Sequence, residues 1–252
     1  MRFPARLAIA AGLALAGVTA FVGLSGMPSA QPLSAPASSG AAHGPIVVEL
    51  FTSQSCSSCP PAEALFRDLA KRPDLVSLEW HVDYWDSLNV AGAGKWKDPY
   101  SSSKWTERQR IYAQNILHTG SVYTPEAVID GAADAEGFNW GVIERKVADA
   151  GRSRPAITLS ATRGEQLNFA ITGAPAGTEA TLVTFRTAAD TDVRGGENKG
   201  RKLASSHIVI AAKDLGEGAS LTAPLPGKDE GCAILLHRKN QGQILAAAYC
   251  PA

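Results

Sequence analysis

The sequence has no excess of charge of either sign. Its 252 residues include 24 lysines and arginines and 24 aspartates and glutamates, so the formal net charge is +0. This balance does not favour nucleic acid or an anionic membrane surface as a partner. Internal repeats and low-complexity blocks are also lacking from residue 45 onward. A hydrophobic content of 45% indicates an ordinary globular protein, long enough for two domains.

Cysteine is scarce, with four residues in the chain and none in the N-terminal segment. Their absence there excludes a lipid-modified cysteine. Two arginines precede an uncharged apolar run from Leu7 to Leu24, which is typical of an export signal. We therefore expect residues 1–30 to be a signal peptide, cleaved after Ala30 or Ala37, and the folded part to be secreted into the periplasm. An uncleaved membrane anchor is the alternative, since the run approaches the length that spans a bilayer.

Two differently patterned regions follow a linker. Residues 31–44 are rich in Ser, Ala, Pro and Gly and are expected to form a flexible linker. Short apolar strands then alternate with amphipathic helices over residues 45–151, which predicts an α/β domain. The expected elements are strands at 46–51 and 75–82, a strand ending at the Asp130-Gly131 turn, and helices at 62–71, 104–117 and 139–150.

Residues 152–252 have a different pattern, in which apolar and polar residues alternate between Gly, Pro and charged turns. This period of two predicts a small all-β, sandwich-like domain. The expected strands cover 157–162, 167–172, 180–187, 208–212, 221–225, 233–238 and 243–249.

The chemistry is concentrated in the motif Cys56-Ser57-Ser58-Cys59, which follows a buried strand and precedes an amphipathic helix. A helix N-terminus stabilises a thiolate, so we expect Cys56 to be the nucleophile and Cys59 the resolving cysteine. This interpretation requires an accessible, acidic Cys56. Ser57 and Ser58 are expected to cap the helix and donate toward the sulfur, and Pro60 is tolerated in the first turn. A structural disulfide or half of a zinc site is the alternative, although zinc needs two more ligands.

Several further segments resemble a known family. They are Phe51-Thr52-Ser53-Gln54 leading into Cys56-Ser57-Ser58-Cys59-Pro60-Pro61, then His81-Val82-Asp83-Tyr84-Trp85-Asp86, Tyr123-Thr124-Pro125, Gly196-Glu197-Asn198-Lys199-Gly200-Arg201 and residues 242–248. Together they resemble a family of secreted bacterial proteins classed as a thioredoxin-like domain of unknown function. The resemblance covers nearly all of the mature chain and departs from the family pattern at Asn89 to Gly94. It implies a thioredoxin-like fold for residues 45–151 and dithiol chemistry, but names no substrate.

The resemblance assigns roles to a proline and a buried acid. Thioredoxin-like proteins place a cis-proline loop beside the dithiol, and Pro125 matches that loop. The backbone of Tyr123 and Thr124 would then pair with an extended substrate peptide; a trans proline is the alternative. Glu49 lies near the position of a buried acid and would exchange a proton with Cys59. A solvent-facing Glu49 is equally compatible with the sequence.

A polar and aromatic segment follows the second expected strand. At the carboxyl end of an α/β sheet, His81, Asp83, Tyr84 and Trp85 would form a substrate wall, with His81 or Asp83 tuning the thiolate. Alternatively, the aromatic rings cover the core and His81 makes a structural hydrogen bond.

Two features of the second region complete the set of candidates. Cys232 and Cys250 flank two apolar strands and are expected to form a structural, cross-strand disulfide around a three-residue loop. The Gly-rich stretch from Arg194 to Arg201 is expected to be a mobile surface loop. If it docks near Cys56, then Arg194, Glu197 or Asn198 would contact substrate.

The leading hypothesis is an exported thiol–disulfide oxidoreductase that uses no cofactor or metal. It would act on a protein or a small thiol and exchange electrons with an unidentified redox partner, and it would contact a membrane only if the N-terminal segment is uncleaved. One alternative is a copper-binding, metallochaperone-like protein, with Cu(I) held by Cys56, Cys59 and His81. Another is a non-catalytic binding module on a thioredoxin scaffold.

Overall fold

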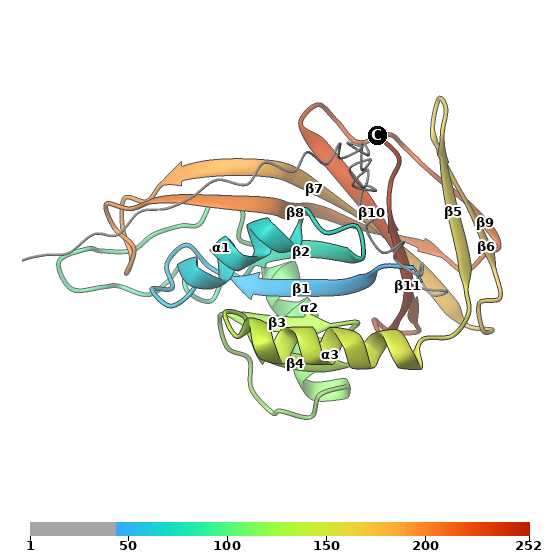
Figure 1. The fold of residues 1–252 in the computed structure, drawn as a ribbon. Coiled ribbons are helices and arrows are strands. Elements are labelled where there is room, and N and C mark those ends of the chain that lie inside the picture. Colours follow the sequence, from blue (N-terminus) through green and yellow to red (C-terminus); the bar gives the residue numbers. More distant parts are fainter. Residues whose placement is uncertain (1–43) are drawn as a thin grey trace, which may run out of the picture. The chain divides into compact units, whose positions relative to one another are not determined.

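The computed structural model describes residues 44–252, which fold around an eight-stranded sheet. The strand order is β11-β10-β7-β8-β2-β1-β3-β4, and a second sheet has the order β5-β6-β9 (Figure 1). The predicted signal peptide and nearly all of the linker lie outside the described residues. The elements are β1 (Ile46–Thr52), α1 (Pro60–Leu69), β2 (Leu75–His81), α2 (Ser103–Asn115), β3 (Glu126–Ile129), β4 (Ala133–Glu136), α3 (Trp140–Ser153), β5 (Thr158–Arg163), β6 (Leu167–Thr172), β7 (Thr178–Asp192), β8 (Lys202–Gly216), β9 (Ser220–Ala223), β10 (Glu230–Arg238) and β11 (Ile244–Tyr249).

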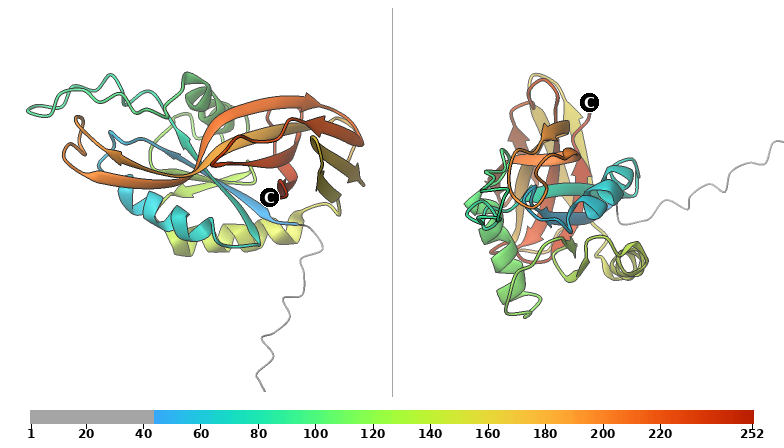
Figure 2. Two further views of the ribbon diagram at one scale, coloured as in Figure 1. Left: turned by 90° about the horizontal axis from the view of Figure 1, so that it is seen from above. Right: turned by 90° about the vertical axis from the view of Figure 1, so that its left-hand side faces the viewer.

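Helices cover both faces of the N-terminal part of the sheet. Figure 2 shows α1 and α3 on one side of the strands and α2 on the other. Because side chains alternate along a strand, neighbouring β1 residues face opposite layers. Phe51 packs with Tyr112 of α2, whereas Leu50 packs with Phe66 of α1 and Ile143 of α3. Strand β1 is thus buried along its whole length, as expected for a strand covered on both faces.

Strand β1 positions the dithiol. It runs parallel to β2, with Thr52 opposite His81, and antiparallel to β3, with Phe51 opposite Glu126. The chain therefore leaves β1 at the sheet edge where β2 ends and β3 begins. Residues far apart in the sequence meet at this edge.

The C-terminal strands differ from the predicted arrangement. The sequence predicts a separate β domain after residue 151, but β7, β8, β10 and β11 continue the sheet that contains β1 and β2. Strand β8 runs parallel to β2, with Ile208 opposite Glu79. Without β8, β2 would expose unpaired backbone groups, and pairing removes that edge. Residues 44–252 accordingly belong to one compact unit.

Only three of the C-terminal strands form a sheet of their own. Strands β5, β6 and β9 pack on β7, β10 and β11 through a core that includes Phe169 and Ile234. A disulfide joins Cys232 to Cys250 with their Cα atoms 5.3 Å apart, and the Cys250 N–H donates to the Cys232 carbonyl at 2.7 Å. This is the pairing predicted from the sequence, and it ties the end of β11 to β10.

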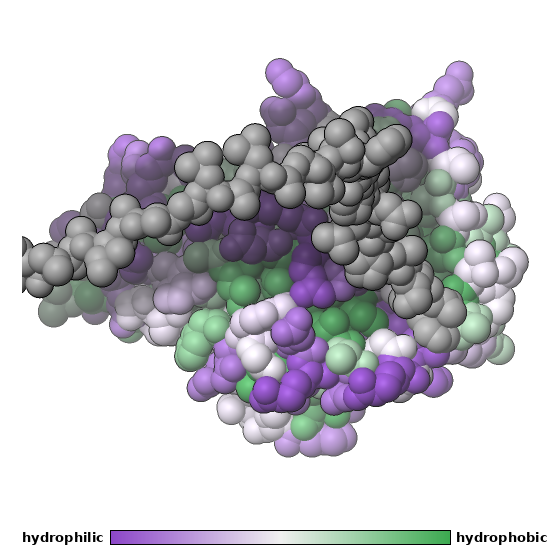
Figure 3. All heavy atoms as spheres, viewed as in Figure 1, coloured by the Kyte–Doolittle hydropathy of each residue, from purple (hydrophilic) through white to green (hydrophobic). Residues whose placement is uncertain are grey.

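The helices within the described residues include no candidate membrane span. None of the helices between residues 44 and 252 is long and apolar enough to cross a bilayer. The space-filling view in Figure 3 shows hydrophilic side chains over the outer side of α3. Its inner side buries Ile143 and Val147, so α3 is an ordinary amphipathic surface helix.

Candidate redox site

A disulfide joins Cys56 and Cys59 in the loop between β1 and α1, with their Cα atoms 5.5 Å apart. Helix α1 begins at Pro60, and Cys59 is its N-cap residue without a side-chain cap. The predicted capping by Ser57 and Ser58 is therefore wrong, because the helix starts after both serines. Ser58 does face the sulfur, however, with its Oγ 3.2 Å from Cys56 Sγ. Its hydroxyl can donate to a thiolate at that position.

The loop before β3 lies against the disulfide. The Thr124-Pro125 peptide bond is cis, and the Thr124 carbonyl oxygen is 3.9 Å from Cys56 Sγ. Trp85 Nε1 donates to Thr124 Oγ1 at 2.8 Å, so the aromatic segment after β2 supports this loop. Of the predicted substrate-wall residues, Trp85 and Tyr84 both form a side-chain hydrogen bond with Thr124, the residue beside the sulfur.

Other predicted site residues are engaged elsewhere. The Thr106 hydroxyl donates to Asp83 Oδ1 at 2.6 Å, and the Tyr84 hydroxyl donates to Gln109 Oε1 at 3.3 Å, so both contact α2. The Tyr123 hydroxyl donates to Asp134 Oδ2 at 2.9 Å. These contacts order the loops around the dithiol and do not direct the side chains at the sulfur.

The position of Glu49 excludes its predicted proton exchange with Cys59. Its carboxylate is buried on the α2 side of the sheet, where Arg108 Nε donates to Oε1 at 2.7 Å and the Tyr112 hydroxyl donates to Oε2 at 2.6 Å. Helix α1, which begins directly after Cys59, packs on the opposite face. Neighbouring side chains on β1 point to opposite layers, so Glu49 faces α2 whereas Leu50 faces α1. Glu49 is therefore part of a structural ion pair with Arg108.

Both cysteines are completely buried in this conformation. The accessible Cys56 that the sequence interpretation requires is therefore absent here, even though the exposed residues Ser57 and Ser58 stand between the cysteines. The tip of the β7–β8 hairpin, residues 193–201, which we call the hairpin tip, lies against the backbone of the motif. This is the segment predicted to be a mobile loop.

The hairpin tip is hydrogen-bonded to the motif. Asn198 Nδ2 donates to the carbonyl oxygens of Gln54 at 3.0 Å and Cys56 at 2.8 Å, and the Ser57 N–H donates to Glu197 Oε2 at 2.8 Å. Gly196 has a φ of +67°, and a Cβ there would lie 2.8 Å from the Ser55 Oγ. Only glycine allows the tip to approach so closely. Among the hydrogen bonds between the hairpin tip and the motif within residues 44–252, none involves Arg194.

Loosening the hairpin tip is expected to expose the disulfide. Asn198→Ala removes two hydrogen bonds to motif carbonyls, which destabilises the closed arrangement by about 1–3 kcal/mol. Reduction of the Cys56–Cys59 disulfide by dithiothreitol should therefore become about 10-fold faster, since about 1.4 kcal/mol corresponds to a factor of ten. The exposed Asn168 on β6 provides the matched control. Equal reduction rates in Asn198→Ala and Asn168→Ala would show that the tip does not restrict access.

A group of buried ionisable side chains lies behind the motif. His81 Nδ1 is 2.8 Å from Asp98 Oδ2, and the same oxygen accepts from the Gln54 N–H at 2.9 Å. Glu63 of α1 accepts a hydrogen bond from the Thr52 hydroxyl at 2.8 Å. Helical periodicity from Ala62 predicts that Glu63 faces solvent, yet it is buried. The signal that could have located it is its spacing, four residues after Cys59.

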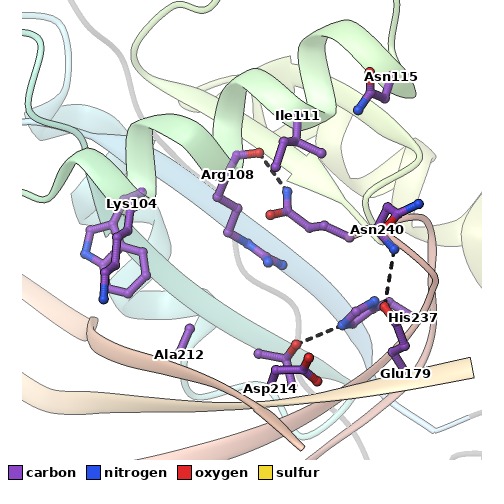
Figure 4. Close-up of a pocket in the computed structure, with 12 residues that line it drawn as sticks. Lys104, Arg108, Ile111, Asn115, Glu179, Ala212, Asp214, His237 and Asn240 are labelled. Atoms are coloured by element: carbon purple, nitrogen blue, oxygen red, sulfur yellow. Dashed lines mark hydrogen bonds between the residues drawn. The ribbon is translucent and has the colours of Figure 1, made fainter. Parts of the chain in front are cut away.

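A separate cavity of about 590 Å³ lies between α2 and strands β7, β8 and β10 (Figure 4). Charged side chains of both signs line it, including Lys104, Arg108, Glu179 and Asp214. His237 Nε2 is 2.8 Å from Thr181 Oγ1 at its wall. None of its lining residues belongs to the dithiol loop or the cis-proline loop, so this cavity is not part of the candidate redox site.

The described residues do not provide the predicted copper site. Within residues 44–252, no group of three or more His, Cys, Asp and Glu side chains is arranged to hold a metal ion. His81 Nδ1 is engaged with Asp98 and the ring is fully buried. The copper-binding alternative therefore has no support from the arrangement of Cys56, Cys59 and His81.

Fold and site together define a mixed α/β protein with a CxxC disulfide, which is compatible with a redox-type role. Residues 47–236 match the family described as protein of unknown function (DUF1223), so the chain belongs to this family. No curated protein gives a significant match.

Two solved structures are similar to this chain. One is an X-ray structure of an Agrobacterium tumefaciens protein determined as a structural genomics target; it is 31% identical over 82% of this chain and 94% of its own, with a TM-score of 0.69. The other, HBP35 of Porphyromonas gingivalis, is 15% identical over 82% of this chain and 74% of its own, with a TM-score of 0.51. The second likeness concerns the fold alone.

Proposed function

We propose that this protein is an exported thiol–disulfide oxidoreductase with a thioredoxin-like fold, and that Cys56 and Cys59 are its redox centre. One observation carries the proposal. A disulfide lies between a buried strand and the start of a helix, and Thr124, in the loop before β3, places its carbonyl oxygen 3.9 Å from Cys56 Sγ. A structural disulfide has no need of this combination, whereas exchange with a bound peptide uses it.

The surroundings of Cys56 support its role as the nucleophile. The positive end of the α1 dipole and the Ser58 hydroxyl both favour a thiolate over a thiol. In the reduced protein, the Cys56 thiolate attacks a substrate disulfide, which forms a mixed disulfide and releases one substrate thiolate. Cys59 then attacks Cys56 Sγ and releases the second. The substrate gains two electrons and the protein dithiol loses two.

Substrate entry requires the hairpin tip to move, because the sulfur atoms are buried in the closed conformation. Displacing the tip would break the two Asn198 hydrogen bonds and free the motif backbone. An extended segment of a client protein could then pair with the backbone at Thr124. A small thiol would need a smaller opening, so the proposed substrates include both proteins and small thiols.

Export is consistent with the cysteine chemistry. Both disulfides, Cys56–Cys59 and Cys232–Cys250, are of the kind that persists in oxidising compartments. We propose the periplasm as the site of action, with a second redox protein that resets the Cys56–Cys59 pair. The direction of electron flow then follows from the reduction potentials of the two proteins.

Trapping the mixed disulfide tests this function. Cys59→Ala leaves Cys56 able to attack a client but removes the thiol that would release it. We expect disulfide-linked adducts that disappear on reduction and are absent from the Cys56→Ser, Cys59→Ala double variant. Both variants are also prepared with Asn198→Ala, which loosens the hairpin tip. If Cys59→Ala then still forms no more adducts than the double variant, Cys56 is not an exchange nucleophile.

A further inference from the structure

The cavity beside α2 has two walls, one contributed by the helix and one by strands β7, β8 and β10 (Figure 4). Its volume of about 590 Å³ falls within the range of roughly 300–1,000 Å³ that is typical of small-molecule sites. Neither the dithiol motif nor the loop before β3 contributes a lining residue. The cavity therefore lies outside the site of the proposed function.

The helix wall of the cavity is basic. Lys104 and Arg108 are four residues apart and Ile111 follows three residues later, so the three side chains share one face of α2. Arg108 is buried, and it donates through Nε to Glu49 and through Nη2 to Tyr112. Its remaining nitrogen, Nη1, forms no hydrogen bond within residues 44–252. A guanidinium that is held in place with one unused nitrogen is suited to bind a carboxylate.

The strand wall of the cavity is acidic. Asp214 of β8 lies opposite Thr181 of β7. Glu179, two residues before Thr181, lies opposite His237 of β10. Opposite residues of an antiparallel pair share a face of the sheet, so both carboxylates face α2. One oxygen of each accepts from a backbone N–H, at 2.7 Å for Asp214 Oδ1 and 3.2 Å for Glu179 Oε2. The second oxygen of each can accept from a ligand.

The opposite charges of the two walls do not neutralise each other. Within residues 44–252, Arg108 forms its salt bridge with Glu49, which does not line the cavity. Lys104, Glu179 and Asp214 form no salt bridge in this part of the chain. A purely anionic ligand would meet the two carboxylates, and a purely cationic one would meet the lysine and the arginine. The charge pattern therefore favours a ligand that carries one group of each sign.

The surface between the charged walls is neutral. Trp105 and Ile111 contribute apolar area from α2. Both ring nitrogens of His237 are bonded within the protein, and burial lowers its pKa, so the ring adds no charge at neutral pH. Side-chain amides of Asn115 and Asn240 also line the cavity. An amide has donors and an acceptor, which match the C=O and N–H of a peptide group.

We propose that this cavity binds a short peptide with free termini. Its carboxylate would contact Arg108 and Lys104 on the helix wall, and its ammonium group would contact Glu179 and Asp214 on the strand wall. A free amino acid carries the same two charges but has no peptide group to meet the amides, and it would fill little of the cavity. This binding is independent of the proposed oxidoreductase function, and no bond of the ligand is broken.

A titration with trialanine tests the proposal. At about pH 7 trialanine carries both terminal charges. It has no other charge and no thiol, so its binding does not report exchange at Cys56. Backbone amide shifts in nuclear magnetic resonance spectra detect binding even at millimolar affinity. We expect saturable shifts along α2 and at residues 179–181 and 212–214. N-acetyl-trialanine and trialanine amide each lack one charge, and each should bind about 10-fold more weakly.

Two substitutions locate the charges that the peptide contacts. Lys104→Gln and Asp214→Asn should each weaken trialanine binding by about 5-fold, the upper end for an exposed ion pair. Lys104→Gln should also narrow the difference between trialanine and its amide, and Asp214→Asn that between trialanine and its acetylated form. Lys213→Gln and Glu107→Gln are the matched controls, because these side chains are exposed on β8 and α2 and do not line the cavity. Both controls should bind trialanine as the unsubstituted protein does.

The comparison of ligands uses the unsubstituted protein, so it does not depend on the folding of any variant. Equal affinities for trialanine and both capped forms would overturn the proposal, as would the absence of saturable shifts at the cavity. Free alanine that binds as tightly as trialanine would overturn the assignment to peptides. None of these results bears on the oxidoreductase function, which the trapping experiment with Cys59→Ala tests separately.

Discussion

Cys56→Ser is expected to reduce the rate of disulfide exchange to that of the uncatalysed reaction. A serine hydroxyl at position 56 cannot form a disulfide with a client, and Cys59, the N-cap residue of α1, acts in the proposed mechanism only on the mixed disulfide that Cys56 forms. Exchange requires a thiolate, and the Ser58 Oγ, 3.2 Å from Cys56 Sγ, can donate a hydrogen bond to one at position 56. Turnover can be measured as reduction of a protein disulfide with dithiothreitol as the electron source.

The second disulfide provides the control for that measurement. Replacing both Cys232 and Cys250 with serine leaves the Cys56–Cys59 loop unchanged and should retain turnover, even though stability falls by about 2–5 kcal/mol. Activity that survives in Cys56→Ser would contradict the proposed mechanism. A client that binds the Cys56→Ser variant and the unsubstituted protein equally, with no turnover by either, would instead favour the non-catalytic binding module.

Arg108→Met is expected to destabilise the fold by about 3–5 kcal/mol, the typical effect of leaving a buried charge without its partner. Arg108 Nε donates to Glu49 at 2.7 Å, its Nη2 donates to the Tyr112 hydroxyl at 2.7 Å, and its guanidinium carbon lies 4.6 Å from the centre of the Trp80 ring. Removing it leaves the Glu49 carboxylate in the core between β1 and α2. Urea unfolding of the oxidised protein, followed by far-ultraviolet circular dichroism, measures the change.

Two comparisons distinguish this effect from general damage to α2. Arg110→Met changes an exposed arginine two residues along the helix and should alter stability by less than about 0.5 kcal/mol. Adding Glu49→Leu to Arg108→Met should recover part of the lost stability, because it removes the isolated charge. Equal unfolding midpoints for Arg108→Met and Arg110→Met would show that the buried pair does not stabilise the sheet.

Local patterns predicted the positions of the helices and of the Cys56–Cys59 pair. The helices expected at 104–117 and 139–150 are close to α2 and α3, because their apolar residues repeat with the helical period. Long-range pairing was harder to predict. Strands β7 and β8 have fifteen residues each, but alternation indicated only 180–187 and 208–212. Residues 188–192 of β7 and 213–214 of β8 are largely exposed, and the buried positions at the start of β8 include the polar Ser205.

The choice of Glu49 as the acid beside Cys59 was wrong because the sequence did not reveal to which face of the sheet its side chain points. Position along β1 suggested Glu49 as the acid beside Cys59, but a strand turns successive side chains to opposite faces, and a one-residue difference selects the α2 layer. Glu63 was missed because helical periodicity placed it on the solvent side of α1, and Asp98 was missed because it belongs to a loop that docks on the motif from elsewhere in the chain. Asn198 was raised only on the condition that its loop docks near Cys56, since hydrophobic periodicity carries no information about such docking.

Short stretches of the chain were sufficient to locate the Cys56–Cys59 pair between a strand and a helix, because those features depend on neighbours within a few residues, whereas the proline loop came from the family resemblance. The surroundings of that pair depend on contacts between segments separated by more than a hundred residues, such as Asn198 with Gln54 and Cys56. Burial of the sulfur atoms, the acid cluster behind them and the continuous sheet therefore arise only when the whole chain packs.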